Sequence, residues 1–123
     1  GVLQAYLPER LLLRRLPAGD TGAVLAVDPA RGFVAELTGR GRTVSLHDPS
    51  LAQSARDADR DAGGGAWVAL LARERIGWLL VNAETASPAL RAGLGRIGAT
   101  RTDSVDRIEL WRMPASSSAD AVP

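Results

Sequence analysis

The chain of 123 residues contains no cysteine and no lysine, and these two absences exclude several classes of chemistry. Without cysteine there are no disulfides, no thiol nucleophile and no thiolate metal ligand. Without lysine there is no P-loop, whose lysine contacts the phosphates, and no mechanism that uses a lysine amine. The fifteen basic residues are all arginine, and the formal net charge is only +1. We therefore expect no nucleic-acid partner, because nothing in the composition gives the chain a strong electrostatic field.

Long hydrophobic runs are also missing. The longest apolar stretches, such as residues 76–81, are far shorter than the roughly 20 residues that a membrane-spanning helix needs. No signal peptide is visible. The chain begins with Gly1 and not with methionine, so we expect it to be a piece of a longer protein or the product of processing. The length and the apolar fraction of 46% fit one domain with one hydrophobic core.

Short apolar runs alternate with helical patterns along the chain. Strands are expected at residues 22–27, 42–47 and 76–81. Helices are expected at 1–16, from Pro29 within the segment 27–37, from 49 to about 61, at 66–75 and at 87–98, and a hairpin at 99–113. The strand at 76–81 is expected to be the central one, and the valine-rich run at 22–27 to be buried on both faces. This alternation predicts an α/β fold: a three-layer, Rossmann-like domain with a mostly parallel sheet and a C-terminal antiparallel hairpin.

Proline marks three helix starts, because Asp28, Asp48 and Ser87 each precede a proline and each can cap a helix N-terminus. Gly98 stands where a helix C-terminus needs glycine. We divide the chain into an N-terminal helix and turn at 1–20, an α/β domain at 21–113 and a disordered tail at 114–123. The leucine-rich N-terminal segment is expected to be a juxtamembrane segment or a helix that caps the domain.

Residues 56–67, RDADRDAGGGAW, contain two patterns that are associated with ligand binding. Asp57, Asp59 and Asp61 alternate as in a calcium-binding loop, but the turn glycine and the distal glutamate of such a loop are both missing. The three glycines that follow lack the third glycine of a dinucleotide fingerprint, and they come after a helix rather than a strand. We interpret the stretch as a solvated helix end and a mobile break before a helix that begins near Trp67. Replacement of Asp59 by alanine is then expected to change stability little.

A small-molecule site is best sought beyond the carboxyl ends of the strands, where ligands bind in open parallel sheets. The side chains that the sequence places at this edge are Asp28, His47, Asp48, Asn82 and Glu84. His47 is the single histidine, and no G-x-S-x-G motif supplies a nucleophile for it, so it fits a strand-end residue that bonds to a loop. We assign no catalytic residue, no metal ligand and no cofactor.

One resemblance is carried by the order of several segments. DPARGFVAEL at 28–37 is followed by HDPSL at 47–51, IGWLLVN at 76–82, ALRAGLGRIGA at 89–99 and IELWRM at 108–113. This order resembles the soluble C-terminal domain of bacterial polytopic membrane glycosyltransferases related to the dolichyl-phosphate-mannose–protein mannosyltransferases. In that family the catalytic acids lie in loops of the membrane part, so the resemblance transfers no catalytic residue to this chain.

The resemblance implies a non-catalytic accessory domain at the periplasmic face of the inner membrane, with the transmembrane part of its own parent chain as partner. Two other functions stay open. One is a stand-alone Rossmann-like domain that binds a small molecule or nucleotide, and the other is a protein-interaction module. For the last of these, self-association through the edge of the C-terminal hairpin is the expected mode.

Overall fold

The computed structural model describes residues 7–16, 23–27, 43–44 and 49–114, and within these ranges the chain has a mixed α/β fold. The helices are α2 (Leu7–Arg14), α3 (Pro49–Asp59), α4 (Gly65–Arg73) and α5 (Pro88–Ile97), and the strands are β1 (Ala23–Val27), β2 (Thr43–Val44), β3 (Ile76–Asn82), β4 (Thr100–Val105) and β5 (Ile108–Arg112). The predicted α/β class is confirmed. The expected helix start at Asp28, the end of the second strand at 45–48 and the tail at 115–123 lie outside the described residues.

The described strands form one sheet in the order β2-β1-β3-β5-β4. β1 pairs in parallel with β2 and with β3, whereas β5 pairs antiparallel with β3 and with β4. The predicted hairpin and the central position of β3 are therefore confirmed. The sheet is mixed rather than mostly parallel, because the hairpin contributes two of these pairings by docking β5 directly against β3.

β1 and β3 are covered on both faces, as their continuous apolar sequences predict. Leu25 and Val27 of β1 belong to one apolar cluster, and Val24 and Ala26 belong to the other. Every residue of β3 except Gly77 is buried. The side chains of successive residues point to opposite faces of a strand, so each of these strands contributes to two cores.

Local signals set the ends of α5. Ser87 is its N-cap, where the hydroxyl oxygen accepts the backbone N–H of Leu90 at 3.0 Å, and Pro88 occupies the first turn. Gly98 ends the helix in a left-handed conformation with φ of 77°. The predicted cap and the predicted C-terminal glycine are both confirmed, because a hydroxyl acceptor and a residue without Cβ suit these two positions.

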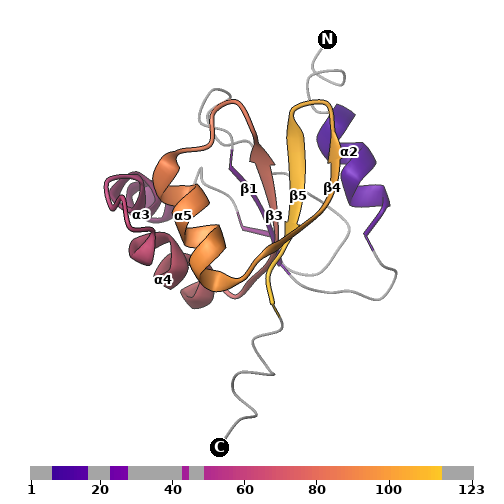
Figure 1. The fold of residues 1–123 in the computed structure, drawn as a ribbon. Coiled ribbons are helices and arrows are strands. Elements are labelled where there is room, and N and C mark those ends of the chain that lie inside the picture. The colour runs from indigo at the N-terminus through magenta and orange to yellow at the C-terminus, as the bar shows by residue number, and fades with distance from the viewer. Residues whose placement is uncertain (1–6, 17–22, 28–42, 45–48, 115–123) are drawn as a thin grey trace, which may run out of the picture.

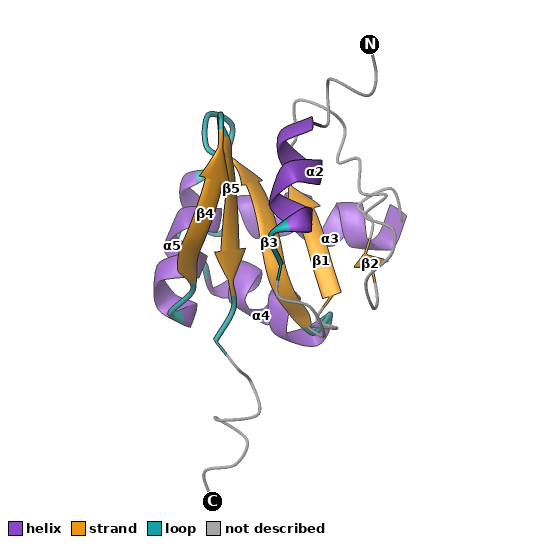
Figure 2. Cartoon of the chain, turned by 90° about the vertical axis from the view of Figure 1, so that its right-hand side faces the viewer, coloured by secondary structure: helices purple, strands orange, loops and turns teal. Residues whose placement is uncertain are grey.

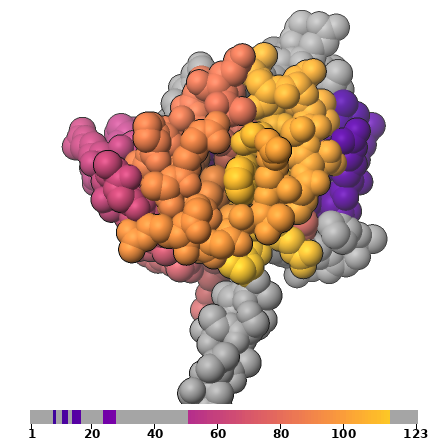
Figure 3. Space-filling view, in the orientation of Figure 1, coloured from indigo at the N-terminus to yellow at the C-terminus, as the bar shows by residue number. Residues whose placement is uncertain are grey.

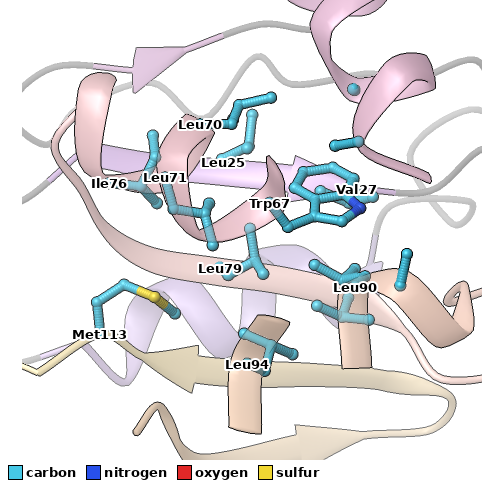
Figure 4. Packing of buried hydrophobic residues seen from close by; sticks show 14 of the residues in the cluster. Leu25, Val27, Trp67, Leu70, Leu71, Ile76, Leu79, Leu90, Leu94 and Met113 are labelled. Carbon is cyan, nitrogen blue, oxygen red and sulfur yellow. The ribbon is translucent and has the colours of Figure 1, made fainter. Parts of the chain in front are cut away.

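The helices cover both faces of the sheet. α3, α4 and α5 lie together on one face, and α2 lies on the other (Figures 1 and 2). On the three-helix face, Trp67 and Leu90 pack with Leu25 and Leu79 of the sheet (Figure 4). On the opposite face, Leu12 and Leu16 of the N-terminal segment pack against the sheet. The strand residues of this cluster are Val24, Ala26, Trp78, Leu80, Ile108 and Leu110. No helix in the described residues is long and apolar enough to cross a membrane.

Candidate functional site

The carboxyl ends of β1 and β3 lie side by side, as the predicted edge requires. Val27 pairs with Val81 in the parallel ladder, so the two strands end at the same level. Of the predicted edge residues, Asn82 and Glu84 lie within the described part of the chain. Asp28, His47 and Asp48 lie outside it. The structure therefore describes this edge of the sheet through the residues that follow β3.

Asn82 organises the turn that leaves β3. Its side-chain Oδ1 accepts the backbone N–H of Glu84 at 2.9 Å, and its main-chain oxygen accepts the N–H groups of Thr85 and Ala86. Asn82 is buried, whereas Glu84 is exposed. The structure thus joins the two predicted residues through a hydrogen bond from the backbone of Glu84 to the side chain of Asn82, a bond that asparagine commonly makes in turns. This contact does not bring their side chains together.

The three aspartates of the stretch at 56–67 have separate partners. Asp57 Oδ1 accepts the side-chain amide of Gln53 at 2.8 Å. Asp61 Oδ2 accepts the backbone N–H of Ala66 at 2.8 Å, which satisfies one of the free amides in the first turn of α4. In the described part of the chain, no three side chains of histidine, cysteine, aspartate or glutamate are grouped to hold a metal ion.

Asp59 is the member of this stretch that sequence reasoning missed. Its Oδ1 accepts the indole N–H of Trp67 at 2.8 Å and the hydroxyl of Ser87 at 2.6 Å. Trp67 is only 1% exposed, so its N–H has little access to water. The expectation that alanine at position 59 would hardly change stability is therefore revised. The sequence gives only a weak indication of this role of Asp59, because its partner Ser87 is distant along the chain.

Gly64 packs closely against α5. It is buried, and it adopts φ of 84° just before α4. A Cβ on Gly64 would lie 2.3 Å from the backbone nitrogen of Gly93 in α5. A Cβ on Gly93 would in turn lie 3.0 Å from the Gly64 oxygen and 3.0 Å from Trp67 Cβ. Gly64 is needed because α4 and α5 approach each other closely here, whereas a Cβ on Gly93 would require its neighbours to shift by a few tenths of an ångström.

A second polar group lies on β5. Glu109 is 8% exposed, and among the side chains whose burial the structure describes it is the one charged residue that is buried. Its Oε2 accepts from Arg101 at 3.0 Å, and its Oε1 accepts the indole N–H of Trp111 at 3.1 Å. The sequence places Glu109 among residues that alternate with the apolar ones, so its burial was not predicted. It is buried because both faces of β5 are covered.

Arg15 and Asp103 form an ion pair between the N-terminal segment and the sheet edge. Arg15 NH1 lies 3.1 Å from both carboxylate oxygens of Asp103. The hydrogen bond from Arg15, together with one from the backbone N–H of Ser104, holds the pKa of the Asp103 carboxyl below its usual value of 3.8. The pair is partly exposed to solvent, with 53% of the Arg15 side chain and 29% of the Asp103 side chain accessible.

Comparison of the chain with protein-family models, with curated proteins and with solved structures gives no match. Function must therefore be inferred from the residues and their geometry. The polar side chains of Asp59, Asn82 and Glu109 all hold parts of the fold together. A general acid or base has to reach a reacting group on a substrate. Within the described ranges, these three buried or bridging groups instead contact the chain itself.

Proposed function

We propose that this chain is a non-catalytic accessory domain of a larger bacterial membrane protein, a glycosyltransferase related to the dolichyl-phosphate-mannose–protein mannosyltransferases. The domain faces the periplasm, and its partner is the membrane-spanning part of the same parent chain. It is a Rossmann-like, three-layer domain in which the N-terminal segment forms the layer opposite α3, α4 and α5. Its contribution is structural, or a contact with acceptor or lipid-linked donor, while the chemistry belongs to the membrane part.

The bonding of the acidic side chains is the observation that carries the non-catalytic part of this proposal. Asp59 accepts two hydrogen bonds through one oxygen, and Asp61 accepts from the first turn of α4. Both oxygens of Glu109 accept from neighbouring side chains. Carboxylates that accept hydrogen bonds from other parts of the chain connect helices and strands. A carboxylate whose oxygens accept from the chain is less available to exchange protons with a substrate, and Glu109 uses both of its oxygens in this way.

The segments that carry the resemblance also support a shared fold. IGWLLVN is β3, ALRAGLGRIGA contains most of α5, and IELWRM contains β5. β3 and β5 are hydrogen-bonded neighbours, and Leu90 and Leu94 of α5 pack in the same apolar cluster as Leu79 of β3. Three of the five segments that carry the resemblance are therefore elements that pack together. Such elements preserve a core, and this is what an accessory domain would share with its relatives.

The complete reading frame tests the proposal most directly. We expect several long apolar spans upstream of residue 1, and we expect the full-length protein in the membrane fraction after cell lysis. A short reading frame without such spans, or a full-length protein that stays in the supernatant, would overturn the proposal. Deletion of residues 23–114 from the parent protein would leave the active-site residues of the membrane part in place. We expect this deletion to lower either the activity of the parent protein or its assembly.

A small-molecule or nucleotide-binding domain is the main competing function. A thermal-shift panel of nucleotides and sugar nucleotides at millimolar concentration distinguishes the two, because a ligand that binds only the native state raises its melting temperature. We expect no shift. If a ligand stabilises the domain, a Glu84→Ala variant with a smaller shift would locate that ligand at the strand-end edge, and the accessory-domain proposal would fail.

The edge of the C-terminal hairpin is β4, which is the last strand of the sheet. Its pairing with β5 shifts register between Arg101 and Asp103, so Thr102 is an extra residue in the ladder. Arg101, Thr102 and Ser104 are exposed along this strand. A bulge and charged side chains limit the pairing of an edge strand with another chain. These features weigh against the self-association that the hairpin pattern predicts.

A further inference from the structure

We propose that residues 7–16 form a releasable strap on the sheet, which undocks as one unit while β1, β3, α4 and α5 keep their native packing. The strap contains α2 and is held by Leu12, Leu16 and the ion pair between Arg15 and Asp103. The inference concerns a conformational device in the fold and does not depend on the accessory-domain function. Figure 2 shows α2 in front of the sheet, with α3, α4 and α5 behind it.

The strap and the three other helices belong to different cores. Leu12 and Leu16 pack in the cluster on one face of the sheet, and the cluster on the other face includes Trp67, Leu71 and Leu90. No residue is shared between the two clusters, because the sheet lies between them. Removal of the strap therefore leaves the packing of the three-helix face in place.

Among the strap side chains that the structure describes, those of Leu12 and Leu16 are the buried ones. α3, α4 and α5 all pack against one another, whereas the main contacts of α2 are with β4 and β5. Leu12 is 0% exposed and Leu16 is 6% exposed, but Arg14 and Arg15 are exposed and Leu11 is only partly buried. A helix of eight residues is not stable by itself in water. Segments with few buried contacts open locally at lower free energy than the rest of a fold.

The ion pair acts as a clasp at the free edge of the sheet. Arg15 approaches both oxygens of Asp103, and these two residues lie 88 positions apart in the sequence. Asp103 stands next to the bulge at Thr102 in β4. In the space-filling view, the indigo surface of the strap adjoins the yellow surface of the hairpin (Figure 3). Because the pair is exposed, salt screens it, so the strap is held less firmly at high ionic strength.

Release of the strap would change the nature of the surface beneath it. The face that shares a cluster with Leu12 also contains Trp78, Leu80, Ile108 and Leu110, all of which are buried in the docked state. The guanidinium of Arg112 lies over the Trp78 ring, 5.5 Å from its centre. Undocking of the strap would take Leu12 and Leu16 away from this apolar face, and exposed apolar faces bind other apolar surfaces.

Hydrogen exchange followed by mass spectrometry tests the proposal on the whole chain. We expect the amides of α2 to exchange faster than those of α4 and α5, through an opening that leaves the latter protected. Asp103→Asn should accelerate exchange in α2 by about two- to fivefold at low salt, the range that an exposed ion pair provides, and should leave α4 and α5 unchanged. Exchange of α2 at the same rate as α4 and α5 would overturn the proposal.

Two controls separate undocking from other causes. Asp106→Asn removes an exposed aspartate from the neighbouring β4–β5 turn, and it should not change α2; acceleration by this variant would show a general charge effect and no clasp. The chain has no cysteine, so Arg15→Cys and Asp103→Cys can be joined selectively by a short bismaleimide. The cross-link should abolish the fast exchange of α2. Fast exchange that persists in the cross-linked protein would identify fraying within the helix and refute undocking.

Discussion

The indole nitrogen of Trp67 donates to Oδ1 of Asp59 at 2.8 Å, and this bond joins the start of α4 to the end of α3. Ser87 donates its hydroxyl to the same oxygen at 2.6 Å and accepts the backbone N–H of Leu90. One carboxylate oxygen therefore connects the ends of three helices. The junction lies at the stretch whose sequence pattern suggested a metal site or a flexible break.

Replacement of Asp59 by alanine should lower the free energy of unfolding by about 1–3 kcal/mol, because the buried N–H of Trp67 would lose its acceptor. The measurement is the urea midpoint, read at constant m-value. Asp57→Ala is the matched control, since the partners of Asp57 are exposed, and it should stay within about 0.5 kcal/mol of the parent chain. Equal midpoints for the two variants would show that the junction contributes nothing.

Alanine at Gly64 and at Gly95 should have opposite effects. A Cβ at Gly64 would clash with the backbone of Gly93 and force a side chain into a left-handed conformation, so we expect a loss of about 2–4 kcal/mol. Gly95 lies in α5, where an added Cβ would meet nothing within 4 Å, and alanine there should stabilise the protein by about 0.5–1 kcal/mol. Thermal unfolding of the two variants checks both signs. A stable Gly64→Ala variant would contradict the close contact between the helices.

Two substitutions of Glu109 should separate its hydrogen bond from its charge. Glu109→Ala should cost about 1–3 kcal/mol, because the N–H of Trp111 loses its acceptor in a largely buried place. Glu109→Gln keeps an acceptor oxygen and should cost under about 1 kcal/mol, since Arg101 is 59% exposed and such an ion pair is weak. Chemical denaturation measures both values. If glutamine is as damaging as alanine, the charge of Glu109 is the important property.

The ion pair between Asp103 and Arg15 should make stability depend on pH in acid. The pKa of Asp103 is lowered in the folded state, so its contribution is fully present above the unfolded value of 3.8. It is lost as the pH falls from there through the lower folded pKa. The difference in stability between the parent chain and Asp103→Asn should be constant near neutrality and should shrink below about pH 4. A difference that is the same at pH 3 and pH 6 would show that the carboxylate charge is not involved.

Local patterns predicted most of the elements. The valine-rich run of β1, the IGWLLV core of β3 and the Ser87-Pro88 start of α5 were all recognisable, because burial on two faces and helix capping impose residue types on consecutive positions. The hairpin was recognisable from the alternation of Ile108 and Leu110 with Glu109 and Trp111. The sheet was nevertheless expected to be mostly parallel. The sequence of the hairpin does not indicate which strand it pairs with, and in the structure β5 pairs antiparallel with β3.

The candidate site was less predictable than the fold. Asn82 and Glu84 were correctly assigned to the end of a strand, but the hydrogen bond that makes Asn82 a turn residue depends on the path of the chain after β3. The role of Asp59 depends on two partners, one of which is 28 residues away. When a side chain could bond to several partners, the tertiary structure determines which of them lies within hydrogen-bonding distance.

By itself, the sequence determined the class of the fold, the position of the central strand and the exclusion of thiol and lysine chemistry. These follow from residue types and from spacing along the chain, which act locally. Only the tertiary structure decided that Gly64 packs on Gly93, that Glu109 is buried and that Arg15 reaches Asp103. The contacts of Gly64 with Gly93 and of Arg15 with Asp103 join segments that are distant in sequence. Their energies depend on distances of a few ångströms that no local pattern encodes.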